Sequence, residues 1–451
     1  MNNSGLITHI DWMLTIFYLV VIFFIASKIQ REQSRRNPIY KYFVSGLFAK
    51  IGGAVGLCLI YVYYYTEGGD TFNYHNDSSA LLKLFFHSPA DFFNVWLSPL
   101  SKETASYFSY ETGYLTYVTD PNTFMVCRLL VPIKLLCFNS YLISSILMAV
   151  VSFTGVWKLY QVFCDCFPAL YKHLAITILF IPSVLFWGSG ILKDSWTLAA
   201  VGWYCYSFYR IFIKRDKIIL PMTTLVLSIF ILITIKPYIF VGLMPGSMLW
   251  MIWNLSGKVK NKAIRIIIAP IIVAFGVVIG VGIWMLTSSN LGRYSTMESM
   301  VEKAYISYDD LRQDYYHGSS FDIGKYDPTL QGILSKFPIA TFTGLFRPFI
   351  WEANNIVMVL AGLENLIIMG FTIFVLIRRP ITAIINLFTN PLVLFCLIFA
   401  VFFAFSVAVS TSNFGALVRL RIPMVPFLLS GIMLIEYGNY ATKVSLEKRK
   451  I

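Results

Sequence analysis

The stretch Thr66–Ser78, TEGGDTFNYHNDS, brings acids, a histidine and two glycines together in a chain that is otherwise largely apolar. It follows an apolar run that ends in the three tyrosines Tyr63–Tyr65, and aromatic belts of this kind mark membrane–water interfaces. The glycine pair lets the backbone turn sharply. We therefore expect a tight loop at a membrane boundary that presents Asp70 to an aqueous space. A surface loop whose Asp and Asn side chains cap a helix stays an alternative.

The composition is that of a polytopic membrane protein. Of the 451 residues, 57% are hydrophobic and 13% are charged, and the mean hydropathy is +0.69. Charged residues make up about a quarter of an ordinary soluble domain. The seven cysteines lie mostly inside or beside apolar segments, and Cys164 and Cys166 have no second pair beside them, so they predict no metal site.

Apolar runs near the length of about 20 residues that a bilayer requires recur along the chain. The predicted spans are Ile10–Ser27, Phe43–Tyr65, Tyr141–Phe163, Leu174–Trp187, Ser195–Ile213, Ile218–Ile235, Tyr238–Asn254, Ile266–Thr287, Asn355–Ile377, Pro391–Val409 and Ile422–Tyr437. Basic residues gather in every second connection, as they do in cytoplasmic loops. The sequence therefore predicts an all-α transmembrane bundle of about eleven spans, with the N-terminus outside and the C-terminus in the cytoplasm.

Two long outer segments, 66–122 and 288–353, interrupt what we expect to be one transmembrane domain over residues 1–451. The first contains LLKLFFHSPADFFNVWLSPL, an aromatic and amphipathic pattern typical of helices that lie in the membrane interface. The next segment, Thr123–Cys137, is apolar but short and carries two cations and a proline, which favours a re-entrant or interfacial helix over a span.

The net charge of +13 raises the question of a nucleic-acid partner. The predicted topology places most of the basic residues in cytoplasmic loops, where such residues are usual. No nucleic-acid partner is therefore expected.

A smaller set of ionisable residues lies on the predicted outer side, where cations oppose the usual bias. Charges at membrane depth are costly unless they are paired or functional. Most of the cations stand beside a glycine or proline that interrupts a predicted helix. The set comprises Asp70, Arg128, Lys134, Lys193, Asp194, Lys236, Arg347, Glu352, Arg419 and Arg421.

If these helix ends converge, they form an outward-facing cavity with several cations and at least one carboxylate. A diphosphate leaving group needs fixed Lys or Arg donors. An acceptor hydroxyl needs a general base, and Asp70 is the best-placed carboxylate. The combination suits glycosyl transfer from a polyprenyl-linked donor at the outer leaflet.

Structural interpretations compete with these roles. Lys193 and Asp194 could form a local ion pair or cap the N-terminus of the fifth predicted span. Arg347 could pair with Glu352 for structure alone.

The later arginines and the histidine have alternatives as well. Arg419 and Arg421 could be interfacial anchors that reach lipid phosphates. His75 is more simply explained as a structural hydrogen-bonding residue than as a catalytic one.

The pattern resembles membrane glycosyltransferases of the GT-C type and the related polysaccharide polymerases of the Wzy and EpsG type. The matching features are an outer-loop GGD (68–70) followed by Tyr74, an apolar pair of helices around PSVLFWGSGILKDS (182–195), and a late GALVRLRIPMVPF segment (415–427). The resemblance implies a GT-C-like bundle. It departs from many GT-C enzymes in that the acid follows the second span rather than the first.

The resemblance also implies roles for individual residues. Asp70 would be the acid that activates the acceptor or positions the donor. The implied contacts to diphosphate or sugar are Lys193, Lys236, Arg347, Arg419 and Arg421, and the supporting residues are Glu67, Tyr74, His75, Asp194, Tyr238 and Glu352. No DxD or paired-acid motif accompanies Asp70, so we expect a metal-independent reaction without a cofactor.

We therefore expect a multi-pass glycosyltransferase of the bacterial inner membrane that assembles a surface polysaccharide. Its substrates would be an undecaprenyl-(di)phosphate-linked donor and a saccharide acceptor. A protein that regulates chain length is a further partner that the sequence leaves undecided. A lipid-linked oligosaccharide flippase is the first alternative, against which stand the scarcity of mid-span charges and the lack of an internal repeat. A non-catalytic assembly scaffold is the second, and it leaves the outer cations unexplained.

Overall fold

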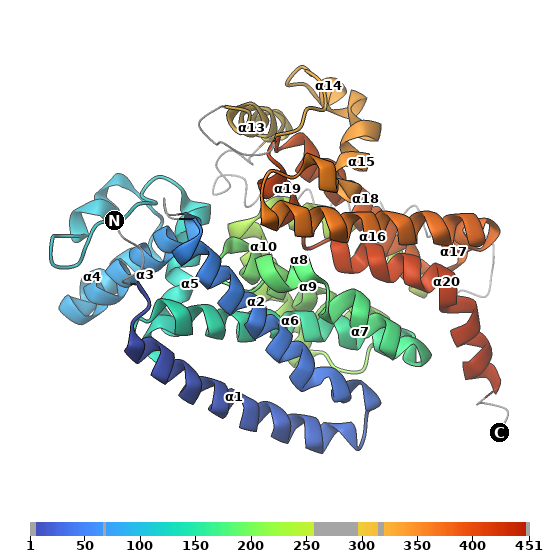
Figure 1. Ribbon diagram of the computed structural model, residues 1–451, viewed down its shortest axis with the longest axis horizontal. Helices are drawn as coiled ribbons and strands as arrows, with labels where there is room; N and C mark the ends of the chain where they lie inside the picture. The colour runs from blue at the N-terminus through green and yellow to red at the C-terminus, as the bar shows by residue number, and fades with distance from the viewer. Residues whose placement is uncertain (1–5, 66–68, 257–295, 314–319, 448–451) are drawn as a thin grey trace. The chain divides into compact units, whose positions relative to one another are not determined.

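The computed structural model describes residues 6–65, 69–256, 296–313 and 320–447 (Figure 1). About 81% of the structure is helical, and the described residues contain no β-strand beyond an isolated bridge between Ser320 and Asn413. The prediction of an all-α bundle is confirmed. The predicted loop acid Glu67 and the predicted span Ile266–Thr287 lie outside the described residues.

The chain forms two compact units, each built from separate stretches of sequence. Unit 1 comprises Met1–Gln161, Leu179–Tyr204 and Val226–Lys236, and unit 2 comprises Val162–Ile178, Cys205–Leu225 and Pro237–Ile451. The expected single domain over residues 1–451 stays a prediction.

The helices of the first half of the chain mostly belong to unit 1, and α6, α9 and α10 contribute residues to both units. They are α1 (His9–Ser34), η2 (Pro38–Tyr42), α2 (Phe43–Tyr63), α3 (Asp70–His87), α4 (Pro89–Leu97), η3 (Lys102–Tyr107), α5 (Pro121–Leu136), α6 (Tyr141–Cys166), α8 (Pro182–Trp187), α9 (Lys193–Phe208) and α10 (Ile219–Ile235). Within this unit α3 packs against α4 and α5, and α2 packs against α1 and α8.

Unit 2 is organised around α18, which packs against α11, α15, α17 and α20. Its elements are η4 (Pro168–Leu170), α7 (Tyr171–Leu179), η5 (Tyr209–Lys214), α11 (Pro237–Ser256), α13 (Met297–Asp310), α14 (Leu330–Ser335), α15 (Phe337–Phe346), η9 (Ile350–Glu352), α16 (Ile356–Arg378), α17 (Pro380–Thr389), α18 (Pro391–Val409), α19 (Phe414–Leu420) and α20 (Val425–Glu447).

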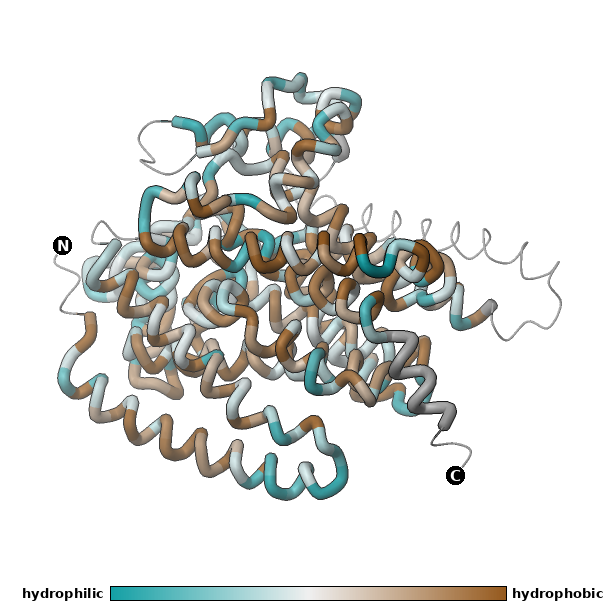
Figure 2. The backbone as a smooth tube through the Cα atoms, turned by 45° about the vertical axis from the view of Figure 1, so that its right-hand side comes forward, coloured by the Kyte–Doolittle hydropathy of each residue, from teal (hydrophilic) through white to brown (hydrophobic). Residues whose placement is uncertain are grey.

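Six helical segments of the described chain are long and apolar enough to cross a membrane. They are α1, Pro38–Tyr63, α6, α11, α16 and α18, and a seventh arises if α19 and α20, which are bent by 65°, count as one broken span. Figure 2 shows hydrophobic residues along most of α1 and hydrophilic residues in the turn that follows it. The structure therefore supports a membrane protein.

The count of about eleven spans was too high for the part of the chain that the structure describes. The predicted span Leu174–Trp187 is two short helices, α7 and α8, separated before Pro182. The predicted span Ser195–Ile213 lies within α9 and η5, which form one continuous helix that is not among the candidate spans. The next predicted span, Ile218–Ile235, is α10, an apolar helix of 17 residues. Hydropathy misleads for α7 and α8 because short helices inside a large protein are as apolar as spans.

The glycine-rich stretch is also less of a loop than the sequence predicted. From Asp70 onward it is helical, and Asp70 stands in the first turn of α3, where a carboxylate interacts favourably with the helix dipole. Gly69 precedes the helix with a φ of 153°, and a Cβ there would lie 2.6 Å from the ring of Tyr61. Gly69 therefore has the unusual backbone conformation that a glycine allows, directly before the helix begins.

Two glycines bring the backbones of α6 and α9 into contact within unit 1. A Cβ on Gly155 would lie 2.1 Å from the carbonyl oxygen of Ala199, and a Cβ on Gly202 would lie 1.9 Å from that of Gly155. Small residues allow membrane helices to approach this closely, and dispersion contacts then stabilise the pair. This crossing fixes α9, whose first residue is Lys193.

We expect Gly155→Ala to separate α6 from α9 and to lower the unfolding free energy by about 1–3 kcal/mol, as other overpacking substitutions do. Thermal unfolding of the purified protein in detergent would measure the loss. Gly52→Ala is the matched control, because a Cβ at Gly52 of α2 meets nothing within 4 Å. Equal unfolding midpoints for the two variants would contradict the close crossing.

Candidate functional site

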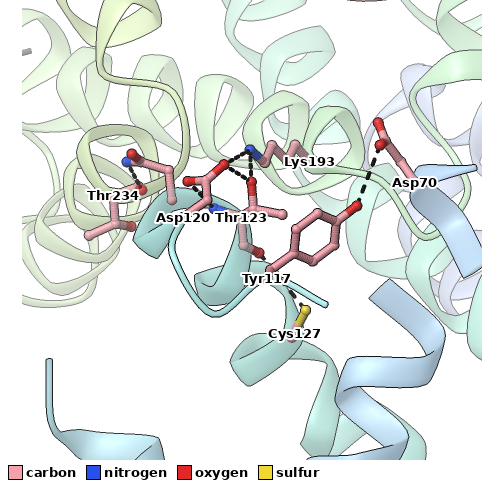
Figure 3. A network of polar contacts seen from close by, with 8 residues as sticks. Asp70, Tyr117, Asp120, Thr123, Cys127, Lys193 and Thr234 are labelled. Carbon is pink, nitrogen blue, oxygen red and sulfur yellow. Dashed lines mark hydrogen bonds and ion pairs between the residues drawn. The ribbon is translucent and has the colours of Figure 1, made fainter. Parts of the chain in front are cut away.

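Asp70 is half-buried at the start of α3, and the hydroxyl of Tyr117 donates to its Oδ1 atom over 3.5 Å (Figure 3). The Tyr117 ring also lies against Tyr74, with 5.4 Å between the ring centroids. Burial raises the pKa of the Tyr117 hydroxyl, and the negative charge of Asp70 raises it further. Tyr117 therefore keeps its proton at neutral pH and can act on Asp70 only as a hydrogen-bond donor.

A second acid of α3, Asp77, holds Tyr117 in this place. It is fully buried, and its two carboxylate oxygens accept the backbone N–H groups of Thr116 (2.8 Å) and Tyr117 (2.9 Å). Asp70 and Asp77 are seven residues apart and so lie on the same side of the helix. Asp77 is one of the acids of the stretch Thr66–Ser78, but it was assigned no role in the predicted site, although this spacing was a usable signal.

Lys193 is the first residue of α9, and its side chain reaches the N-terminus of α5. Its Nζ atom is 3.7 Å from Oδ2 of Asp120 and donates to the hydroxyl of Thr123 (Figure 3). Asp120 caps α5 by accepting the Thr123 N–H over 3.1 Å, and its carboxylate is about half exposed. A lysine beside a helix N-terminus is a favourable place for an anion, because the cation and the helix dipole act together.

Asp194, the neighbour of Lys193, has a partner far along the chain. Its Oδ1 atom is 2.5 Å from Nζ of Lys236, and both side chains are buried. The ion pair links the start of α9 to the end of α10. The two structural interpretations of Lys193 and Asp194 were a local ion pair and a cap of the helix N-terminus. Both residues lie in the first turn of α9, and each contacts an oppositely charged residue far along the chain, Asp120 for Lys193 and Lys236 for Asp194.

We expect Lys236→Met to cost about 3–5 kcal/mol of unfolding free energy, because it leaves the buried Asp194 carboxylate without this cation. The double variant Lys236→Met/Asp194→Leu should recover most of that loss, since removing both charges of a buried pair is often nearly neutral. Unfolding midpoints in detergent would report both values. A single variant as stable as the wild type would rule out this pair as a structural link.

His75 and Lys134 form a buried polar cluster between α3 and α5. The Nζ atom of Lys134 lies 2.9 Å from Nδ1 of His75, 2.7 Å from the Ser79 hydroxyl and 2.6 Å from Oδ1 of Asn139. Three acceptors match the three donors of an ammonium group. Burial lowers the pKa of Lys134 to about 7, and burial together with Lys134 lowers the pKa of His75 well below its usual value. This arrangement favours the structural interpretation of His75.

The lowered pKa of Lys134 makes stability depend on pH. Between about 7 in the folded state and about 10.4 in the unfolded state, the unfolded chain binds more protons, so the unfolding free energy rises with pH. We expect the wild type to gain up to about 1.4 kcal/mol per pH unit from this group in that window, and Lys134→Met to lack the gain.

Unfolding midpoints in detergent at pH 7, 8 and 9 would test this expectation. Lys83→Met provides the control, because Lys83 is an exposed lysine of α3. If the pH profile of Lys134→Met parallels that of Lys83→Met, Lys134 is not the group that titrates.

In unit 2, Arg347 is held by Glu352 and by aromatic rings. Its Nε atom lies 3.0 Å from Oε1 of Glu352, and its guanidinium is 5.1 Å from the ring centroid of Phe414 and 5.7 Å from that of Phe321. Glu352 also accepts the Phe349 N–H over 2.8 Å. The predicted structural pairing of Arg347 with Glu352 is therefore present, and both side chains keep a minor exposed part.

Arg421 is fully buried at the break between α19 and α20. Its Nη1 atom donates to the carbonyl oxygens of Gly344 (3.1 Å), Leu345 (3.3 Å) and Arg347 (2.8 Å), and Nη2 donates to Asn365. These carbonyl groups end α15, where helices leave such acceptors unsatisfied. The anchor interpretation, which needs contact with lipid phosphate, does not fit a side chain buried in this way.

The remaining predicted residues of unit 2 have different surroundings. Arg419 is half-buried in the last turn of α19. The ring of Tyr238 stacks on Phe403, with 5.8 Å between the centroids.

The predicted site residues are thus divided between the two units. Unit 1 holds Asp70, Tyr74, His75, Lys193, Asp194 and Lys236, and unit 2 holds Tyr238, Arg347, Glu352, Arg419 and Arg421. Among the residues that the structure describes, no three His, Cys, Asp or Glu side chains lie close enough to hold a metal ion.

No protein-family model, no curated protein and no solved structure matches this chain. Functional assignment therefore depends on the chemistry of the two groups of residues.

Proposed function

We propose that this protein is a membrane glycosyltransferase of the polysaccharide polymerase type, which transfers a saccharide from a polyprenyl-diphosphate donor to a saccharide acceptor. The observation that supports this most is the setting of Asp70. It is a half-buried carboxylate directly after the spanning segment Pro38–Tyr63, it accepts a hydrogen bond from Tyr117, and Asp77 fixes the backbone of that tyrosine. A carboxylate at a membrane boundary with a positioned donor beside it suits a general base.

In the proposed reaction, the Asp70 carboxylate takes the proton of an acceptor hydroxyl. The acceptor oxygen then forms a bond to the anomeric carbon of the donor sugar, and the bond between that carbon and the diphosphate oxygen breaks. The electron pair leaves with the diphosphate. Tyr117 is proposed to orient the carboxylate and to keep one of its oxygens directed at the acceptor.

Lys193 is the proposed contact for the leaving diphosphate in unit 1. It lies at the N-terminus of α5, where the dipole adds to its charge. When the donor binds, its phosphate would replace the half-exposed Asp120 as the anion beside Lys193. Lys236 and Arg421 are proposed to support the fold instead, because Asp194 and backbone carbonyls hold them. Arg347 and Arg419 belong to unit 2, and their roles stay predictions.

The proposal includes a GT-C-like arrangement in the bacterial cytoplasmic membrane, with the N-terminus outside and the C-terminus in the cytoplasm. The basic connections on one predicted side support this orientation. The donor would be linked to undecaprenyl (di)phosphate, no metal or other cofactor would take part, and a separate chain-length regulator could act on the product.

A lipid-linked oligosaccharide flippase is the second candidate, and Lys50 is the observation that favours it. This lysine lies within the spanning segment Pro38–Tyr63, is fully buried, and donates to the carbonyl oxygen of Val184 over 2.8 Å. Ionisable residues inside spans often mark a transport path, and transporters place discontinuous helices such as α7 and α8 at their binding sites.

We expect Asp70→Asn to lower surface polysaccharide by about 10²–10⁴-fold, the usual contribution of a general base, at an unchanged protein level. A strain lacking the gene would carry each variant, with polymer measured on gels and protein by immunoblot. Glu103→Gln is the control, because Glu103 is an exposed acid of the same outer segment.

Two other outcomes would redirect the assignment. Normal polymer in Asp70→Asn would remove Asp70 from the chemistry. Normal polymer in Asp70→Asn together with its loss in Lys50→Met, again at wild-type protein level, would favour the flippase.

A further inference from the structure

The segment 107–117, here called the tyrosine segment, carries tyrosines at positions 107, 110, 114 and 117. Tyr110 is 91% exposed and Tyr114 is 69% exposed, and Tyr107 is exposed as well. The fourth tyrosine, Tyr117, turns inward and donates to Asp70. The segment therefore carries accessible tyrosine rings and, at its end in sequence, the tyrosine that contacts the proposed catalytic carboxylate.

The tyrosine segment is held in a defined conformation although, after Tyr107 at the end of η3, it lies outside the helices. The Ser109 N–H donates to the hydroxyl of Thr112 over 2.8 Å, and the Gly113 N–H donates to the carbonyl oxygen of Ser109 over 2.8 Å. Gly113 has a φ of 86°, which favours glycine. Since Asp77 fixes the far end, much of the ordering that a ligand would otherwise impose is already present.

The exposed side chains of this segment differ from those of the neighbouring helices. At the end of α3 and on α4, the exposed side chains include Phe86, Phe93 and Leu97, which suit the acyl region of a membrane interface. The tyrosine segment instead exposes phenols together with Glu111. A phenol offers a flat apolar ring and a polar hydroxyl, a combination that fits a ligand with both apolar C–H faces and many hydroxyls.

We infer that the tyrosine segment binds the growing saccharide acceptor and directs its end toward Asp70. The sugar rings lie on Tyr110 and Tyr114, and the side-chain hydroxyls and Glu111 bind sugar hydroxyls. Large rings with few rotatable bonds supply such contacts at low entropic cost. This inference rests on the proposed function, and it identifies the acceptor as a chain of several sugars rather than a single residue.

The test compares Tyr110→Ala/Tyr114→Ala with Tyr110→Phe/Tyr114→Phe in the strain that lacks the gene. Each ring lost should weaken acceptor binding about two- to tenfold, so the alanine variant should make shorter chains because the acceptor dissociates earlier. The phenylalanine variant retains the rings and should keep chains close to wild-type length. Tyr64→Ala, which removes an exposed tyrosine outside the segment, is the control and should leave the length unchanged.

Polymer length on gels and protein level on immunoblots separate the outcomes. Wild-type chain length in the alanine variant, with polymer abolished in Asp70→Asn, would overturn the acceptor surface and leave the proposed function standing. A reduced level of membrane-inserted protein in the alanine variant, with normal chain length, would show that the tyrosines bind lipid and would equally overturn it. If deletion of the gene leaves the surface polysaccharide unchanged, the proposed function fails and the inference fails with it.

Discussion

The cost of removing a charge from water governs how this protein uses its ionisable residues. A buried ion is tolerated only where a countercharge or several hydrogen bonds replace its hydration. The structure meets this demand in different ways: Asp194 meets Lys236, Lys134 meets three neutral acceptors, and Arg421 meets the carbonyl groups at the end of α15. Each of these ions has at least one partner on an element distant in sequence, so charge compensation also fixes helix positions.

The same demand separates structural ions from those available for chemistry. Asp70 and Lys193 are only partly buried, and the side chains that they contact, Tyr117 and Asp120, are themselves partly exposed. A ligand can replace such contacts at a moderate cost in free energy. Breaking the contact between Lys236 and Asp194 costs more, because it removes the countercharge of a buried ion. Within unit 1, the proposed chemistry therefore centres on the first turn of α3 and the N-terminus of α5.

Sequence patterns predicted the helical class and most of the long helices well. The predicted spans Tyr141–Phe163, Asn355–Ile377 and Pro391–Val409 match α6, α16 and α18 to within a few residues. The pattern failed where short helices are apolar because protein surrounds them, as in α7 and α8. It also missed Lys50 and the role of Asp77, because a single polar residue in an apolar or mixed run carries no sign of what it will contact.

The length, the composition and the positions of the charged residues along the chain were enough to predict a helical membrane protein. They also marked Asp70, Lys193 and the later arginines as unusual. They could do so because hydropathy and local charge are properties of neighbouring residues in the chain. Tertiary structure alone decided which ions are compensated, since the partner of Asp194 lies 42 residues away and that of Asp77 lies 39 and 40 residues away. Only folding brings those groups to within hydrogen-bond distance, and with them it decides which carboxylate stays accessible.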